Sequence, residues 1–172
     1  MSRYSLRPIE STTVVEALFR AHAARVYRTA RCLGVPSADV DDIVQEVFVI
    51  AHRRRDAFVA GSSEPAWLHA ICVRVVAAWR RRAVRRHERV METLPDLVEL
   101  RDPERQTASL QLLARALEAL DDDKRTVFVL AELEQLDMAE VAAAVGCPLK
   151  TAYSRLYAAR EIFARTLGKE QA

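Results

Sequence analysis

The polar side chains between residues 149 and 160 have the types and spacing that recognition of DNA requires. A helix in the major groove needs hydrogen-bonding side chains near its N-terminus for base edges, and cations nearby for phosphates. At about 100° per residue, one side of a helix over this range would carry both kinds of group. The outward residues would be Lys150, Thr151, Tyr153, Ser154 and Tyr157, with Arg155 and Arg160 at the margins. The chemistry on offer is noncovalent binding of bases and phosphates.

Two helices joined by a tight turn would position these side chains. Asp137 and Glu140 have the spacing of a capping box, with Asp in place of Ser or Thr. Gly146 can adopt the left-handed conformation that ends a helix, and Pro148 suits the start of the next one. We expect the second helix to bury Leu149, Ala152, Leu156, Ala159 and Phe163. Taken alone, the pattern fits a DNA-binding helix-turn-helix and a helical hairpin with a solvated face about equally well.

A second polar set lies where residues 39–48 read Asp-Val-Asp-Asp-Ile-Val-Gln-Glu-Val-Phe. Apolar residues at three- and four-residue steps predict a helix from Ser37 or Asp39 to about Phe58, with one buried stripe. The opposite face would carry Asp41, Asp42, Gln45 and Glu46. Acids in a first turn also favour the helix dipole, so each could simply be solvated. No nucleophile, metal cluster or apolar pocket accompanies them, so we expect no catalytic function.

The third set is a run of arginines at the end of a helix that begins near Ala66. Seven arginines and one glutamate lie between Arg74 and Arg89, although the formal net charge of the chain is only +2. Local charge of this kind indicates nucleic-acid binding, because so many like charges repel one another and are costly unless a polyanion neutralises them. We expect Trp67 and Trp79 in the core. The other half of the helix would present His69, Ala70, Val73, Arg74, Ala77, Arg80 and Arg81.

The chain as a whole has the composition of an all-α protein. Its 172 residues suffice for one ordinary domain or two small ones, and 51% are hydrophobic but only 6% aromatic. We predict two small helical domains joined by a linker, the C-terminal one containing the helix-turn-helix. The expected ranges are 12–90, 91–109 for the linker with its two prolines, and 110–167. The residues leave open whether the two domains pack together.

Cofactors and membrane insertion are not expected. The three cysteines, at positions 32, 72 and 147, are far apart and form no metal-binding motif with histidine. The N-terminal residues lack the apolar stretch of a signal peptide, and the most apolar run, 66–79, is too short to span a bilayer. We therefore expect a cytoplasmic protein with no metal site and no cofactor.

In this order and spacing the three sets resemble a group 4 sigma factor, the extracytoplasmic-function (ECF) type of the sigma-70 family. The acidic segment resembles the family's core-binding segment. Ala66-Trp-Leu-His-Ala-Ile and the arginines resemble its segment for the −10 element. Leu117-Glu-Ala-Leu through Arg160, with Thr-x-x-Ser-Arg-Leu-x-x-Ala-Arg, resembles its region 4. The resemblance covers about residues 12–90 and 110–167.

The resemblance implies a role for each set. Asp41, Asp42, Gln45 and Glu46 would bind a coiled coil of core RNA polymerase. The −10 strand would contact Phe58, Arg74, Arg80 and Arg81. The −35 duplex would contact Lys150, Thr151, Tyr153, Ser154, Arg155 and Arg160. The implied function is promoter recognition and DNA melting at transcription initiation, with core polymerase and promoter DNA as partners and an anti-sigma factor as a further candidate.

The sequence also departs from the family at the −10 surface. The family often has basic residues at the positions of Ala70 and Val73, usually Asn at Arg74, and often Asp at Ala78. The promoter sequence therefore does not carry over. The departures motivate an alternative, a DNA-binding or protein-binding regulator that no longer supports initiation and acts as a decoy or binds only an anti-sigma partner. An enzyme is the least supported class.

Overall fold

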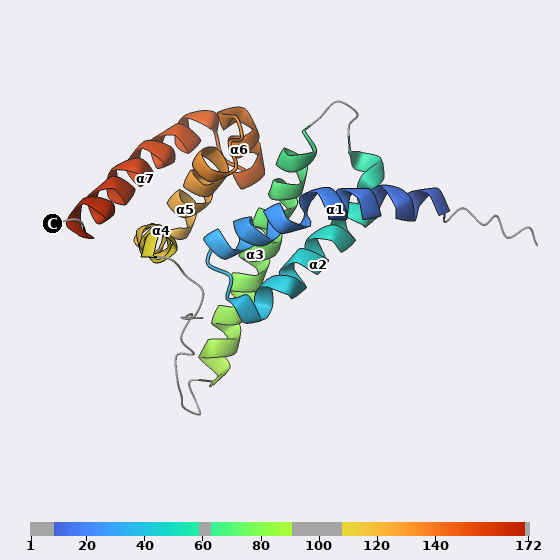
Figure 1. The fold of residues 1–172 in the computed structure, drawn as a ribbon, viewed down its shortest axis with the longest axis horizontal. Coiled ribbons are helices and arrows are strands. Elements are labelled where there is room, and N and C mark those ends of the chain that lie inside the picture. The colour runs from blue at the N-terminus through green and yellow to red at the C-terminus, as the bar shows by residue number, and fades with distance from the viewer. Residues whose placement is uncertain (1–8, 59–62, 91–107, 171–172) are drawn as a thin grey trace, which may run out of the picture.

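The computed structural model describes residues 9–58, 63–90 and 108–170, and the regular elements within these ranges are all helices (Figure 1). This confirms the all-α class. The α-helices are α1 (Ile9–Cys32), α2 (Ser37–Arg53), α3 (Glu64–Val90), α4 (Ala108–Glu118), α5 (Asp122–Phe128), α6 (Met138–Val145) and α7 (Leu149–Glu170). A 3₁₀ turn, η1 (Arg55–Ala57), follows α2, and a π-helical turn, η2 (Val129–Leu133), follows α5. None of the described helices combines the length and apolarity that crossing a bilayer requires.

The first three helices form an N-terminal unit around the predicted apolar stripe of α2. Gly34 has a φ of +92°, which favours glycine, and turns the chain from α1 into α2. Val40, Ile43 and Val47 are buried among apolar side chains of α1 and α3. Trp79 of α3 donates an indole hydrogen bond to Asp39, with 3.1 Å between Nε1 and Oδ2. Helix α2 ends at Arg53 and not near Phe58 as predicted, because the chain tightens into η1.

The remaining helices form a C-terminal unit, which includes the predicted capping box and glycine end of one helix. Asp121 accepts a hydrogen bond from the backbone N–H of Lys124, which fixes the start of α5. Asp137 and Glu140 form the capping box of α6, and Gly146 ends that helix with a φ of +70°. Phe128 and Phe163 stack with ring centroids 4.5 Å apart and join α5 to α7. After α5 the chain changes to π geometry at Val129 instead of staying α-helical.

The two units pack against each other, and α3 lies between α2 and α6 (Figure 1). Buried apolar residues from both units make one cluster, which includes Ile71 and Val76 of α3 and Val141 and Ala144 of α6. Turn η2 also contacts α1. The sequence left a packed and an extended arrangement open, and the structure has the packed one. The predicted linker, 91–109, lies outside the described residues except for 108 and 109, which begin α4.

Candidate nucleic-acid interface

The N-terminal half of α7 presents an exposed polar face beside the turn at Gly146. Lys150, Tyr153, Ser154 and Tyr157 are exposed, and Thr151 is half-buried. The Tyr153 and Tyr157 rings lie 6.4 Å apart at an interplanar angle of 23°. The Arg160 guanidinium carbon lies 5.8 Å from the centroid of the Tyr157 ring. Hydrogen-bonding, aromatic and cationic groups therefore share one side of the helix, which suits contact with bases and phosphates.

Leu149 corrects the predicted burial of α7. Its side chain is 46% exposed, whereas Ala152, Leu156 and Ala159 are buried as predicted. The helical period places Leu149 on the buried side, but it is the first residue of α7, where the helix has just left the turn. Helical periodicity predicts burial least well at a helix end, because the first residue has helical neighbours on only one side along the chain.

The two arginines at the margins of α7 are paired with acids of the same unit. Arg155 Nη2 lies 2.5 Å from Asp123 Oδ2, and Arg160 Nη2 lies 2.6 Å from Glu132 Oε1. Exposed ion pairs contribute only about 0–1 kcal/mol. A phosphate can therefore replace either acid at small cost. The pairs hold both guanidinium groups beside the polar face.

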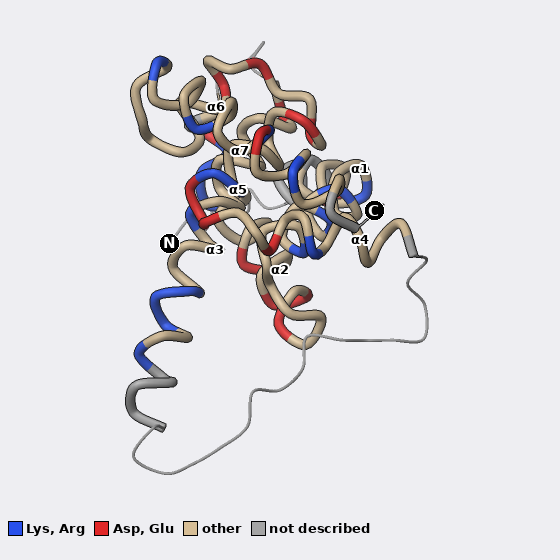
Figure 2. Tube along the Cα trace, turned by 90° about the vertical axis from the view of Figure 1, so that its left-hand side faces the viewer, with Lys and Arg blue, Asp and Glu red and all other residues tan. Residues whose placement is uncertain are grey.

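The arginines of α3 do not share one environment. Figure 2 shows basic residues along the C-terminal part of α3. Arg74 and Arg81 are exposed, as expected. Arg80 is half-buried, donates a hydrogen bond to the backbone oxygen of Leu33, and lies 3.2 Å from Asp122 of α5. Burial lowers the pKa of Arg80, and Asp122 opposes this shift. The sequence grouped Arg80 with the freely exposed arginines because Asp122 is far away along the chain.

The aromatic residues and His69 of this region lie in the interior or at its edge. Phe58 packs on Trp67 with ring centroids 5.1 Å apart. Trp67 and Trp79 pack partly buried against the core, as expected. His69, predicted on the outer half of α3, is 1% exposed and lies 3.2 Å from Glu134 of the C-terminal unit. Residue 69 therefore faces protein in this structure.

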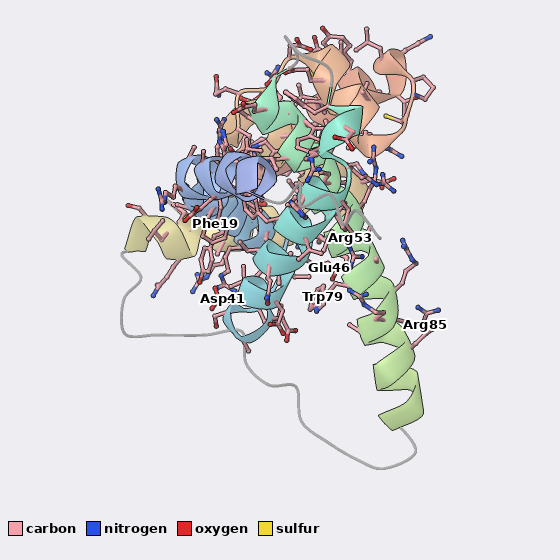
Figure 3. All side chains as sticks on the ribbon, turned by 90° about the vertical axis from the view of Figure 1, so that its right-hand side faces the viewer. Phe19, Asp41, Glu46, Arg53, Trp79 and Arg85 are labelled. Carbon is pink, nitrogen blue, oxygen red and sulfur yellow. The ribbon has the colours of Figure 1, made fainter. Side chains whose placement is uncertain are left out.

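A groove of about 640 Å³ lies between α2 and α3 beside the predicted acidic face. Figure 3 shows Glu46 of α2 and Trp79 of α3 at this groove, with Arg85 farther along α3. The lining residues are Asp39, Asp42, Ile43, Glu46, Trp79, Arg82 and Arg85. Glu46 Oε2 lies 3.2 Å from Arg82 Nη2. Of the predicted acidic set, the groove brings together Asp42 and Glu46, whereas Asp41 and Gln45 are exposed outside it.

Sequence reasoning missed the α3 side of this groove. Trp79, Arg82 and Arg85 recur at three-residue steps, and such residues lie near one another on a helix. This spacing is a usable signal, but an apolar environment for Trp79 and a common DNA-binding role for the arginines are the simpler predictions from sequence. The acidic side was found because its residues lie opposite a clear apolar stripe.

Two of the cysteines, Cys32 and Cys72, are buried or half-buried thiols with raised pKa values. Burial, together with the charge of Glu134, raises the pKa of the Cys72 thiol to about 12. Burial also raises the pKa of Cys32. A thiol reacts through its thiolate, so these two are poor nucleophiles at neutral pH. Among the described side chains, no three His, Cys, Asp or Glu residues lie together as metal ligands would.

The comparisons with known proteins agree with this two-part architecture. The family "Sigma-70 region 2" matches residues 18–86, and "Sigma-70, region 4" matches residues 110–162. The ECF RNA polymerase sigma-E factor of Escherichia coli K12 is 36% identical over 139 residues, covering 74% of this chain and 73% of that protein. The ECF RNA polymerase sigma factor SigM of Mycobacterium tuberculosis is 30% identical over 153 residues, covering 89% and 76%.

Solved structures show the same fold. The sigma factor RpoE of Bartonella quintana, in complex with the anti-sigma factor NepR, aligns with a TM-score of 0.77 at 23% identity, covering 89% of this chain and 96% of that one. CnrH, in complex with the cytosolic domain of CnrY, aligns with a TM-score of 0.68 at 27% identity, covering 92% and 90%.

The fold, the helix-turn-helix and the two matched regions define a bipartite transcription factor of the initiation machinery. The chain belongs to the ECF sigma factors of the sigma-70 family. Its function is therefore that of a sigma factor, which directs promoter recognition at transcription initiation. Sigma factors are known as regulators of transcription, and an enzyme is also the class that the sequence supports least.

Proposed function

We propose that this sigma factor binds core RNA polymerase through the α2–α3 groove, the −10 strand through α3, and the −35 duplex through α7. The proposed domains are residues 12–90 and 110–167, with 91–109 as the linker. The observation that carries the proposal is the separation of two exposed polar surfaces onto different units, an acid-lined groove on the region 2 unit and a polar recognition face on the region 4 unit. Since polymerase and promoter DNA are its proposed partners, we place the protein in the cytoplasm.

The composition of the groove supports a protein partner there. The acids of α2 that line the groove, Asp39, Asp42 and Glu46, would repel DNA phosphates. Arg82 and Arg85 on the opposite wall complement the charge of these acids. Tryptophan and arginine are enriched where proteins bind one another, and Trp79 lines the groove between the two charged walls. A polymerase helix with side chains of both signs would fit this surface. The exposed Asp41 and Gln45 would extend the contact along α2.

The exposed face of α7 supports contact with duplex DNA. Lys150, Thr151, Tyr153 and Ser154 lie in the first turns of the helix, which is the part that reaches base edges in helix-turn-helix proteins. Arg155 and Arg160 would exchange their acidic partners for phosphates. This binding is recognition and involves no covalent chemistry of the chain itself.

The −10 assignment rests on Phe58 and the arginines of α3. Arg74 and Arg81 are exposed and can engage both the phosphates and the base faces of a single strand. Phe58 lies at the N-terminal end of the same surface, on Trp67. Arg80 would join them once its contact with Asp122 is released.

An anti-sigma factor is a third candidate partner. CnrH, which is 27% identical to this chain, was solved with the cytosolic domain of CnrY bound. A partner that bound the α2–α3 groove of the present chain would compete with polymerase there.

Promoter selection with the reconstituted holoenzyme tests the proposed function. The full chain and core RNA polymerase would be combined on a library of random upstream sequences, and run-off transcripts would be sequenced. We expect enrichment of two sequence blocks about two turns of DNA apart, roughly 70 Å. Core polymerase alone is the control. Binding to duplex DNA without any transcript above that control would support the non-initiating regulator instead.

A further inference from the structure

One face of α3 is occupied by the chain's own C-terminal unit. His69 approaches Glu134, and Arg80 approaches Asp122, so both residues face that unit. At about 100° per residue, Val73 lies within about 40° of both on the helix surface, and it is half-buried against the core. We call His69, Val73 and Arg80 the covered face. It comes from the half of α3 that the sequence assigned to DNA.

Glu134 is the centre of a buried polar cluster across the contact between the units. Its side chain is only 8% exposed. The carboxylate accepts a hydrogen bond from Arg25 Nε at 2.5 Å and from the Thr29 hydroxyl at 2.7 Å, and it lies 3.2 Å from His69 Nε2. The backbone oxygen of Glu134 accepts a second bond from Arg25, at 2.5 Å. We call these four residues the Glu134 cluster.

Every partner of Glu134 in this cluster belongs to the other unit. Arg25 and Thr29 lie on α1 and His69 lies on α3, whereas Glu134 follows η2. A buried carboxylate is stable only when it is paired and hydrogen-bonded. Burial raises the pKa of Glu134, but the contacts with His69, Arg25 and Thr29 outweigh this effect and lower the pKa to about 2. Glu134 therefore stays charged in the interior, and the closed arrangement supplies the groups that make this possible.

A second polar contact lies at the other end of the covered face. Arg80 reaches Leu33 and Asp122. A Cβ atom built on the neighbouring Gly34 would lie 2.7 Å from Arg125 Nη1, so the C-terminal unit approaches this turn closely. His69 and Arg80 are eleven residues apart, which is about 16 Å along an α-helix. The two contacts thus bracket the covered face.

We propose that the Glu134 cluster holds the free sigma factor in a closed state in which the C-terminal unit hides the covered face of α3 from single-stranded DNA. The proposal rests on the proposed function in one respect, the assignment of α3 to the −10 strand. Opening separates Glu134 from all its partners and returns it to water. It also frees Arg80 to join Arg74 and Arg81. Glu134 acts here as a positioning residue, since it touches no DNA.

The test compares Glu134→Gln with Thr29→Val in the full chain without polymerase. Each change keeps the side-chain size but removes the charge or one hydrogen bond of the cluster. Glu118→Gln, at an exposed glutamate on α4, is the matched control. Small-angle X-ray scattering gives the radius of gyration, and circular dichroism reports whether the helices are intact. Fluorescence anisotropy measures binding of a labelled, random-sequence single-stranded 20-mer.

We expect both cluster variants to keep their helicity, to have a larger radius of gyration than the wild type, and to bind the 20-mer about tenfold more tightly. Apparent affinity rises with the fraction of molecules in the binding-competent state. The control should match the wild type. An unchanged radius of gyration in both folded variants overturns the proposed role of the cluster. Expansion without tighter binding overturns the claim that closure hides a DNA surface, and transcription by the wild-type holoenzyme then shows whether the proposed function survives.

Discussion

Two sides of α3 differ in what lies against them. On one side Trp79, Arg82 and Arg85 line a groove that is open to solvent and faces the acids of α2. On the other side the covered face meets Glu134 and Asp122 of the C-terminal unit. Arg74 and Arg81 lie between these two sides and are exposed. The same helix therefore has a side that lines an open groove, an exposed basic side, and a side covered by the C-terminal unit.

The difference teaches that a run of arginines does not identify its own ligands. Seven arginines lie between Arg74 and Arg89, but those described by the structure have different partners. Arg82 pairs with an acid of α2, and Arg80 pairs with an acid of α5. Acids that lie far away in the sequence decide which guanidinium groups remain available for DNA.

Reversing charge in the groove should have the largest effect. Asp42→Arg with Glu46→Arg places like charges opposite Arg82 and Arg85, so we expect core polymerase affinity to fall by about a hundredfold or more, since breaking buried charge complementarity costs several kcal/mol. Binding is measured by competition for labelled core enzyme, with circular dichroism to check helix content. Glu16→Arg on α1 is the exposed control. Wild-type affinity in the folded double variant would remove the groove from the polymerase interface.

Arg155 extends the comparison to α7, where an arginine is held by an acid but remains beside an exposed face. We expect Arg155→Ala to weaken −35 duplex binding by about 1–3 kcal/mol if the residue contacts a base, or to reduce the salt slope by about one if it contacts a phosphate. Binding is measured by anisotropy over a range of salt concentrations. Asp123→Ala, which frees Arg155 without removing it, should preserve or strengthen binding. An Arg155→Ala variant unchanged in both quantities would contradict the assignment.

The exposed and covered arginines of α3 should affect different steps. Arg74→Ala with Arg81→Ala should slow open-complex formation by roughly tenfold, because Arg contacts single strands through both phosphates and bases. Core binding and −35 binding should persist. Permanganate reactivity of unpaired thymines measures opening, and a premelted template should restore much of the lost transcription. Opening of linear promoters at the wild-type rate would show that this surface is only solvated.

Arg80→Ala sharpens the same comparison. It removes an inter-unit contact as well as a candidate DNA contact, so the free protein should expand in scattering, which the Arg74 and Arg81 variants should not do.

Lowering the pH should have the smallest effect on the closed state, because Glu134 stays charged until the solution is clearly acidic. The pKa of Glu134 is lowered from 4.5 to about 2, so the charged group stabilises the closed state above pH 4.5, and this contribution is lost as the pH falls toward 2. The groups that face it are Arg25 and His69, with the thiols of Cys32 and Cys72 nearby. The radius of gyration of the wild type should rise between pH 5 and 3. Glu134→Gln should show a weaker dependence than Glu118→Gln, and identical curves would contradict this linkage.

Local signals predicted the fold well. The capping box at Asp137 and Glu140, the left-handed Gly146 and the apolar stripe of α2 are confirmed because each depends on residues a few positions apart. Those signals also found the polar face of α7 and the acidic half of the groove. The burial of His69 and the pairing of Arg80 could not be predicted in the same way, because their partners come from another unit through an arrangement that periodicity does not encode.

The π-helical turn η2 has a consequence for how closure is specified. In η2 the N–H of Glu134 bonds the oxygen of Val129, five residues earlier, at 3.0 Å. A π turn holds about one residue more than an α turn. If the same residues of η2 took α geometry, position 134 would turn by roughly 100° about the helix axis, away from Arg25 and His69. The contact between the units through Glu134 therefore depends on the π geometry of this single turn, which aims one side chain at the other unit.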